Sequence, residues 1–197
     1  MTASYLALDI GGGSGRGIVG TLDGGRLILT EIHRFSNFHV HAAGKDYWDP
    51  YYLFHEMIVA AETALRRFPE LRSLSVDLWG NDFALLDRRG DIVGWPRCTR
   101  NSDGSGMRTF FEKVMPERDY FRLCGCQLRP GNAVFQLYER QLEGDPALAR
   151  AETFLMLPDL FGYLFTGRRF AEYTIATTGQ LAALDGSGWN REMIAAL

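Results

Sequence analysis

The stretch LALDIGGGSGRGIVG, from Leu6 to Gly20, determines how the rest of the sequence is interpreted. It begins as an apolar run that ends in an acid, passes through a cluster of glycines and ends in a second short run with β-branched residues. Runs of this kind, bounded by glycine, are typical of β-strands. We therefore expect two strands joined by a glycine loop, and the next question is what this loop binds.

The glycine spacing matches a dinucleotide-binding motif only in its letters. Gly15, Gly17 and Gly20 give G-x-G-x-x-G, but that motif must open a helix whose N-terminus receives a pyrophosphate. Here the turn sequence DGG at 23–25 follows instead, which predicts a hairpin and a third strand over 26–35. A P-loop is excluded as well, because the sequence contains no G-x-x-x-x-G-K-[ST].

A glycine loop between two strands can still bind an anion. Consecutive backbone N–H groups can form a nest, and glycines let a phosphate approach without a clash with Cβ. Ser14 would add a hydroxyl and Arg16 a charged fork beside such an anion. Asp9, at the end of the first strand, would be useful there only with Mg²⁺ or a bridging water. A glycine-rich hairpin with a surface acid and arginine remains the alternative.

The composition is that of an ordinary globular protein, with 46% hydrophobic and 23% charged residues in 197. The net charge of -3 and the absence of a basic run argue against a nucleic-acid partner. We find no signal-like segment and no apolar stretch of about 20 residues, so we expect a cytoplasmic protein without membrane contact. Neither the three cysteines nor the loop with His39 and His41 is expected to bind metal.

The remaining pattern predicts an α/β protein whose second half is mostly helical. Asp49 and Pro50 mark the start of a helix that ends near residue 68. Period-two alternation predicts a strand within LRSLSVDL at 71–78, and we expect a hairpin over 83–96. Helical patterns then occupy 107–114, 118–123, 133–142, 157–166 and 190–197, and the last lacks a capping residue after it.

These motifs together resemble the FGGY family of carbohydrate kinases, whose fold is ribonuclease H-like, as in the actin-like ATPases. The match continues through EIHRFSN, YWDPYYLF, SVDLWGNDFALLD, RPGNAVFQLY, LMLPDLFGYLFTG and EYTIATTGQL, in the order of the rhamnulokinase branch. The resemblance implies a mixed central sheet of five strands flanked by helices. It further implies that residues 1–197 form an N-terminal actin-like domain that is truncated before its end, and that the last strand and a C-terminal ATP-binding domain lie beyond residue 197.

The resemblance also implies roles for individual residues. By position, Asp9 is similar to the aspartate that contacts metal and phosphate, and the first phosphate loop corresponds to Gly12, Gly13, Ser14, Gly15 and Arg16. The sugar contacts of the family correspond to Trp79, Gly80, Asn81 and Asp82, together with Gly131 and Asn132. The aspartate that acts as catalytic base in the family lies in a motif expected beyond residue 197.

Four positions depart from the rhamnulokinase pattern. Asn81 replaces an apolar residue and Gly131 an aromatic one, while Asn101 replaces an aspartate and Ile175 an asparagine. Loss of an aromatic wall removes an apolar face of about 150 Å² or more, so we expect room for a larger or differently oriented polyol.

The resemblance implies an enzyme that uses ATP and Mg²⁺ to convert L-rhamnulose to L-rhamnulose 1-phosphate. The 197 residues alone are expected to be inactive, because a positioned base contributes roughly 10²–10⁴ in rate. Two alternatives stay open: a non-catalytic sugar-binding or remnant module, and a kinase of a different ketose or polyol. If the strand at 71–78 lacks a neighbour, its open edge should promote self-association.

Overall fold

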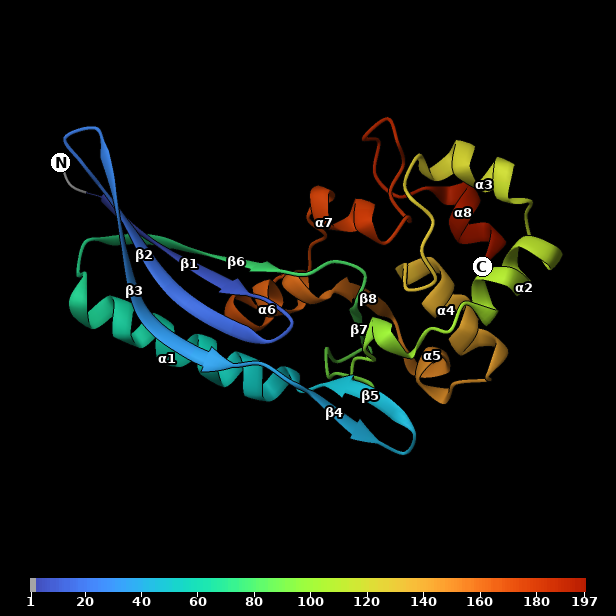
Figure 1. Ribbon diagram of the computed structural model, residues 1–197, viewed down its shortest axis with the longest axis horizontal. Helices are drawn as coiled ribbons and strands as arrows, with labels where there is room; N and C mark the ends of the chain where they lie inside the picture. The colour runs from blue at the N-terminus through green and yellow to red at the C-terminus, as the bar shows by residue number, and fades with distance from the viewer. Residues whose placement is uncertain (1–2) are drawn as a thin grey trace.

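The computed structural model describes residues 3–197 and places a twisted sheet at one end and a group of helices at the other (Figure 1). The sheet has the order β3-β2-β1-β6. Its strands are β1 (Ala3–Ile10), β2 (Ser14–Asp23), β3 (Arg26–Ser36) and β6 (Leu71–Leu78). The first three form an antiparallel meander, and β6 runs parallel to β1. The expected strands and the mixed sheet are confirmed.

Helix α1 (Pro50–Arg67) covers one face of this sheet (Figure 1). The Asp49 carboxylate caps it by accepting hydrogen bonds from the N–H groups of Tyr51 and Tyr52, both at 3.0 Å, as the Asp-Pro pair predicts. Alternate residues of β1 point toward the helix and are buried. Helix and sheet approach closely because Gly17 has no side chain: a Cβ there would lie 2.9 Å from the Cβ of Ala60.

The segment with the two histidines is a hairpin and not the expected loop. Strand β4 (His39–Ala42) pairs antiparallel with β5 (Lys45–Trp48). Ala43 and Gly44 both have positive φ, at 50° and 75°, as a tight hairpin turn requires. Apolar residues do not alternate along both of these strands, because the hairpin has no face that is fully buried.

The expected hairpin over 83–96 is present in a short form, and its first strand also makes a long-range pairing. Strand β7 (Phe83–Leu86) pairs with β8 (Thr153–Met156). The two arms of the turn are joined by the bridge Leu86↔Ile92 and by two backbone hydrogen bonds, from the Val93 N–H to the Leu85 carbonyl at 2.8 Å and from the Asp87 N–H to the Asp91 carbonyl at 2.9 Å. All four residues of β7 are buried, so its sequence has no period-two pattern that would identify its partner. Strand β8 was not predicted, since four residues are too few to show a period.

The helical second half is confirmed, with short additions. A 3₁₀ turn at Thr99–Asn101 precedes the helices α2 (Ser105–Lys113), α3 (Glu117–Cys124), α4 (Ala133–Leu142), α5 (Pro146–Arg150), α6 (Leu157–Thr166), α7 (Tyr173–Thr178) and α8 (Arg191–Ala196). Gly167, with φ at 70°, ends α6 as predicted. Helix α6 joins α1 beneath the sheet, while α2, α3 and α4 share an aromatic core.

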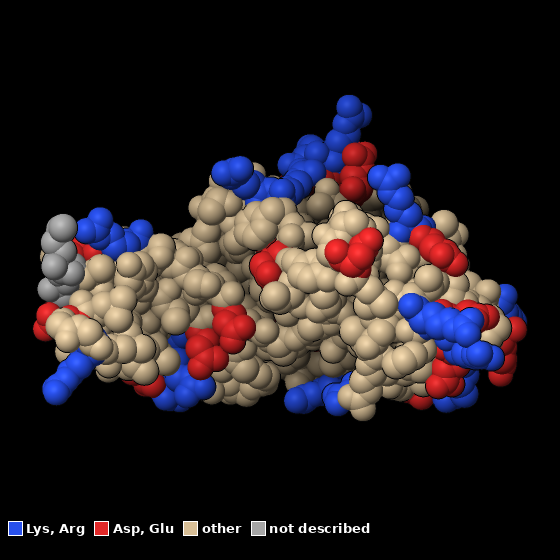
Figure 2. Space-filling view, turned by 90° about the horizontal axis from the view of Figure 1, so that it is seen from above, with Lys and Arg blue, Asp and Glu red and all other residues tan. Residues whose placement is uncertain are grey.

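Strand β6 is the last strand of the sheet on its side, as the sequence led us to expect. Leu74 in this strand remains 37% exposed, because no further strand covers that edge among the described residues. The basic side chains on the face shown in Figure 2 lie in separate groups toward its rim, and acidic side chains are scattered between them. Among residues 3–197 we find no helix that is both long and apolar enough to cross a membrane.

Candidate functional site

Two segments that lie about seventy residues apart in the sequence meet at one end of the sheet. Strands β1 and β6 are parallel and in register, with Ile10 opposite Leu78. The glycine loop Gly11–Gly13 and the turn Trp79–Asp82 therefore leave neighbouring strand ends. Open α/β sheets bind their ligands outside the carboxyl ends of such strands. The structure thus brings both predicted groups of residues to the same edge.

The glycine loop leaves open space over its tip. A Cβ added to Gly13 would meet no atom within 4 Å, and one added to Gly12 would meet only the Arg100 guanidinium, at 4.0 Å. The loop is closed by a hydrogen bond from the Gly11 N–H to the Ser14 carbonyl at 2.9 Å. The tip therefore offers backbone without side chains and has a guanidinium beside it.

Asp9 and Arg16 flank this loop as an ion pair. They lie directly opposite each other in β1 and β2, and an Arg16 Nη is 2.8 Å from an Asp9 Oδ. Both side chains are about 40% exposed: Asp9 is 40% and Arg16 39%. The Nε of Arg16 is buried and has no partner within the described residues. The pair thus holds one acidic and one basic group at the mouth of the loop.

Gly15 has a different role from the one expected of it. It lies inside β2, and a Cβ at this position would come within 2.1 Å of the Phe35 ring. A glycine is required here because the ring occupies the space of a side chain. The sequence cannot distinguish this packing glycine from Gly12 and Gly13, which lie in the open loop.

Asp82 does not line an open surface, which corrects the expectation that it contacts a sugar. Asp82 is fully buried, with 0% of its surface exposed. One of its carboxylate oxygens accepts hydrogen bonds from the indole N–H of Trp48 at 2.6 Å and from that of Trp79 at 2.9 Å. Burial raises the pKa of Asp82, and the hydrogen bonds from the indoles and Gln136 oppose this. Asp82 fixes the two indoles, whose ring centroids are 4.3 Å apart.

The other predicted sugar-wall residues form one hydrogen-bonded network. The Asn132 amide donates to the Asn81 side chain at 3.0 Å and to the Thr178 carbonyl at 3.1 Å. Gln136 donates to the carbonyls of Asn81 and Gly131, at 3.1 and 2.8 Å. Asn81 has φ at 76°, a conformation that asparagine tolerates better than the expected apolar residue. The two parts of the predicted sugar wall are thus linked directly.

Sequence reasoning missed three members of this network. Gln136 lies on a buried turn of α4, Thr178 ends α7, and Trp48 is a buried core residue whose indole N–H also reaches Asp82. Of the three, only Gln136 could have been found from the sequence. It lies at an apolar position of the helical pattern, where a buried amide needs hydrogen-bond partners.

The glycine at position 131 does not open the space expected there. A Cβ on Gly131 would lie 1.8 Å from the Thr99 hydroxyl, which donates a hydrogen bond to the Gly131 carbonyl at 3.0 Å. Asn101 also has a local explanation: its amide donates to the Asp46 carbonyl and accepts from the Asp46 N–H, both at 2.8 Å. An aspartate could not make the first of these bonds.

The described part of the chain contains no cluster of three His, Cys, Asp or Glu residues that could hold a metal by itself. His41 pairs with Asp46 at 2.8 Å, and the three cysteines are free. Burial raises the pKa of the Cys98 and Cys124 thiols.

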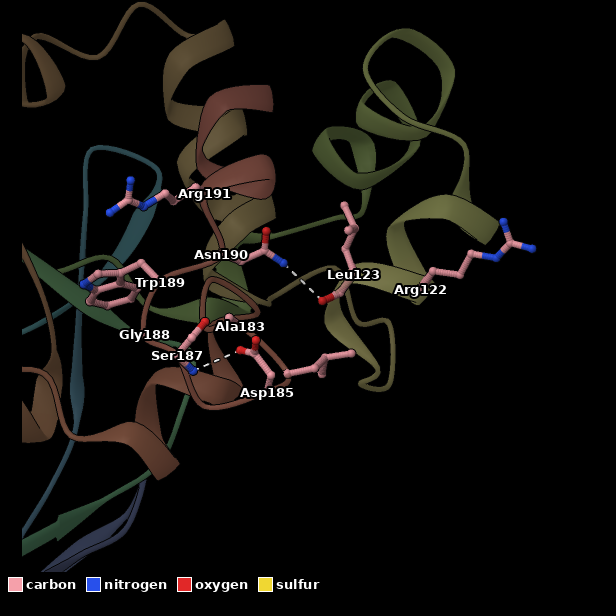
Figure 3. A pocket seen from close by; sticks show the side chains of 10 residues that line it. Arg122, Leu123, Ala183, Asp185, Ser187, Gly188, Trp189, Asn190 and Arg191 are labelled. Carbon is pink, nitrogen blue, oxygen red and sulfur yellow. Dashed lines mark hydrogen bonds between the residues drawn. The ribbon is translucent and has the colours of Figure 1, made fainter.

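Two of the hollows in the described part of the chain are lined mainly by residues outside the glycine loop and the Trp79–Asp82 turn. One, of about 660 Å³, lies between α3 and the segment 183–191, and its Asp185 and Asn190 side chains bond to backbone nearby, while the Arg122 side chain points away (Figure 3). The other, of about 640 Å³, runs beside β6 and α6 and is lined in part by Asp159. Asp159 is buried, and one of its oxygens has no partner in the described residues.

Comparison with known proteins agrees with this geometry. No family model matches the chain. Over 181 residues, or 92% of the chain, the sequence is 34% identical to a rhamnulokinase of Bacteroides thetaiotaomicron, of which the match spans 37%. A gluconate kinase from Lactobacillus acidophilus superposes with a TM-score of 0.84 at 12% identity, over 99% of this chain and 39% of that one. The chain is thus similar in sequence to part of the rhamnulokinases and similar in fold to part of the FGGY-type sugar kinases.

The structural likeness extends across the FGGY-type kinases. The glycerol kinase of Plasmodium falciparum, solved with ADP, superposes with a TM-score of 0.76 over 98% of this chain and 40% of that one, at 13% identity. These neighbours have the actin-like ATPase fold, so the expected fold class is confirmed. The chain spans about two fifths of the length of the curated relatives it matches.

Proposed function

We propose that this chain forms the N-terminal domain of an ATP-dependent sugar kinase, whose intact form phosphorylates a ketose of the L-rhamnulose type. One observation carries the proposal: the glycine loop and the Trp79–Asp82 turn leave adjacent strand ends, so a phosphate and a sugar bound to them would be neighbours. Transfer of a phosphoryl group depends mainly on positioning and on neutralising charge.

On this proposal the phosphates lie over Gly12 and Gly13. The open space above these residues fits a group that needs close approach to backbone. Ser14 would add a hydroxyl, and the guanidinium groups of Arg16 and Arg100 would offset the negative charge of the phosphates. Gly15 contributes by leaving room for Phe35, which keeps β2 against β3.

Asp9 fits the role of a contact to Mg²⁺ that arrives with a nucleotide. Magnesium usually keeps several waters and takes one or two carboxylates together with phosphate oxygens. One half-exposed carboxylate beside the loop suits this donor set, whereas it would not form a metal site by itself. Bound Mg²⁺ would neutralise charge that develops on the phosphates.

The sugar would lie against the wall formed by Trp79, Gly80, Asn81, Gly131 and Asn132. Its amides offer the hydrogen-bonding groups that a polyol requires, and the partly buried Trp79 indole offers an apolar face. Asp82 would act as a positioning residue, because its contacts hold the indole in place.

The proposal is tested by measuring ADP release and sugar binding by this chain. With Mg-ATP and L-rhamnulose we expect no turnover, since the chain spans only about two fifths of the length of the rhamnulokinases it matches. We expect L-rhamnulose to perturb the NMR signal of the Trp79 indole, and D-xylulose and glycerol serve as competitors. Sugar-dependent turnover that Asp9→Asn abolishes would show that the chain is a complete enzyme, and absence of any sugar binding would contradict the proposed wall.

A sugar-binding module without catalysis is the second candidate, because Asn81 and Gly131 depart from the expected pattern. The DNA directly downstream discriminates between the two. A reading frame that continues into an aspartate-containing kinase motif supports the first, and a stop codon without a partner gene supports the second.

We also propose that β6 promotes self-association. Its outer edge has no strand beside it in the described residues, and unpaired edges pair with other chains. Light scattering should show dimers or larger species, and a sharp monomer at high concentration would contradict this.

A further inference from the structure

Asn37, which directly follows strand β3, forms two hydrogen bonds with the glycine loop. The Asn37 amide donates through Nδ2 to the Gly11 carbonyl at 2.8 Å, and the Asn37 N–H donates to the Gly13 carbonyl at 3.1 Å. One residue thus binds the first and the last glycine of the loop. Both carbonyls bind Asn37 and the Gly11 N–H binds the Ser14 carbonyl, so the N–H groups of Gly12 and Gly13 remain, with open space beside these two residues.

Asn37 is itself held in place by its neighbours. The preceding Ser36 carbonyl accepts a hydrogen bond from the Tyr52 hydroxyl at 2.8 Å, which joins it to α1. Phe35 fills the space that Gly15 leaves in β2 and meets the Tyr52 ring edge-on, with centroids 6.4 Å apart. Helix α1 therefore fixes the end of β3, and the end of β3 fixes the loop.

If the side-chain amide of Asn37 served only the structure, it would lower the stability of the folded state. Asn37 is 5% exposed, and its Oδ1 is buried with no donor in the described part of the chain. A buried acceptor without a partner lowers the stability of the folded state. An apolar residue of similar size would avoid this cost but could not donate to Gly11. The side chain is thus explained by its donor, which acts on the loop.

We propose that Asn37 is a positioning residue that sets the glycine loop in the shape that receives a phosphate. The inference rests on the proposed function, because it assigns the loop to phosphate. Asn37 does not touch the ligand. It acts through the carbonyls of Gly11 and Gly13, which leaves the N–H groups of Gly12 and Gly13 for a ligand.

The test compares Asn37→Asp with Asn190→Asp. Asn190 is also buried and also donates from Nδ2 to a backbone carbonyl, that of Leu123 at 3.1 Å, but it lies far from the loop. NMR amide exchange would be measured at Gly11 and at residue 37, and Mg-pyrophosphate would be titrated as the phosphate probe. We expect both amides to exchange at least tenfold faster in Asn37→Asp and the affinity to fall at least tenfold, with neither change in Asn190→Asp.

The two arms separate the failure of this inference from that of the proposed function. Unchanged amide exchange in a folded Asn37→Asp variant, or equal acceleration in Asn190→Asp, overturns the role of Asn37. Failure of the wild-type chain to bind pyrophosphate overturns the assignment of the loop to phosphate. Asn37→Ser, which introduces no charge, replaces Asn37→Asp if that variant does not fold, and the same accelerated exchange is then expected.

Discussion

The glycine loop and the tryptophan-aspartate network lie at one edge of the sheet, but they are built in opposite ways. The loop exposes its backbone, is held by a few hydrogen bonds and is flanked by a half-exposed ion pair. The network is buried, and Asp82 alone binds two indoles and an amide. A site that must admit a large anion needs an open part, and a site that must orient a hydroxyl needs a rigid part. The difference between the two therefore predicts different responses to substitution.

The largest effect is expected from Asp82→Ala. This change leaves the indole N–H groups of Trp48 and Trp79 buried without their acceptor, and it should lower the free energy of unfolding by about 4 kcal/mol. Urea denaturation followed by circular dichroism measures this. Asp185→Ala, in an exposed loop, is the matched control, and a similar loss in both variants would remove the contrast between network and surface.

Gly15→Ala should rank second, at about 3 kcal/mol, because its Cβ would overlap the Phe35 ring. Gly13→Ala is the control, since its Cβ would meet no atom within 4 Å, and it should change stability by less than about 0.5 kcal/mol. Thermal melts of both variants give the comparison. Addition of Phe35→Leu to Gly15→Ala should recover part of the loss, and equal effects at the two glycines would contradict the separation of packing from loop glycines.

Asp159→Asn should change how stability depends on pH. Burial raises the pKa of Asp159 to about 6, and the charge of Glu172 adds to this. A carboxyl whose pKa is higher in the folded state stabilises the protein fully below its unfolded pKa, and this contribution is lost as pH rises through the folded value. The wild type should therefore lose about 2 kcal/mol relative to Asp159→Asn between pH 4 and pH 7.5. The free energy of unfolding would be measured for both proteins across this range. The same pH dependence in both would contradict a raised pKa of Asp159 in the folded state.

The smallest effect on stability is expected from Arg16→Gln. The ion pair with Asp9 is about 40% exposed, and pairs of this kind contribute less than about 1 kcal/mol. Binding of Mg-pyrophosphate should nevertheless fall at least tenfold, because the guanidinium lies at the mouth of the loop. Calorimetric titration measures the binding and a thermal melt the stability. A large loss of stability with unchanged binding of Mg-pyrophosphate would show that Arg16 stabilises the fold and does not bind phosphate.

The two regions also differ in how well the sequence predicted them. The glycine loop and its flanking strands are local, so the period of the strands and the turn at 23–25 identified them. The network joins Trp48, Asp82 and Gln136, which belong to three separate elements. No local period encodes such contacts, and the fold had to be known before Asp82 was recognised as buried. For the same reason, the four-residue strand β8 escaped prediction while the long helix α1 did not.

The close indoles of Trp48 and Trp79, whose planes are tilted by 43°, can report spectroscopically on this edge of the sheet. Their centroid separation of 4.3 Å places two strong chromophores within exciton-coupling range, whereas Trp95 and Trp189 are exposed by 43% and 41%. A soluble quencher would therefore suppress the emission of the outer pair first. Trp48 and Trp79 would keep their emission until the hydrogen bonds from their indoles to Asp82 break. The state of this edge of the sheet can therefore be followed spectroscopically without a label.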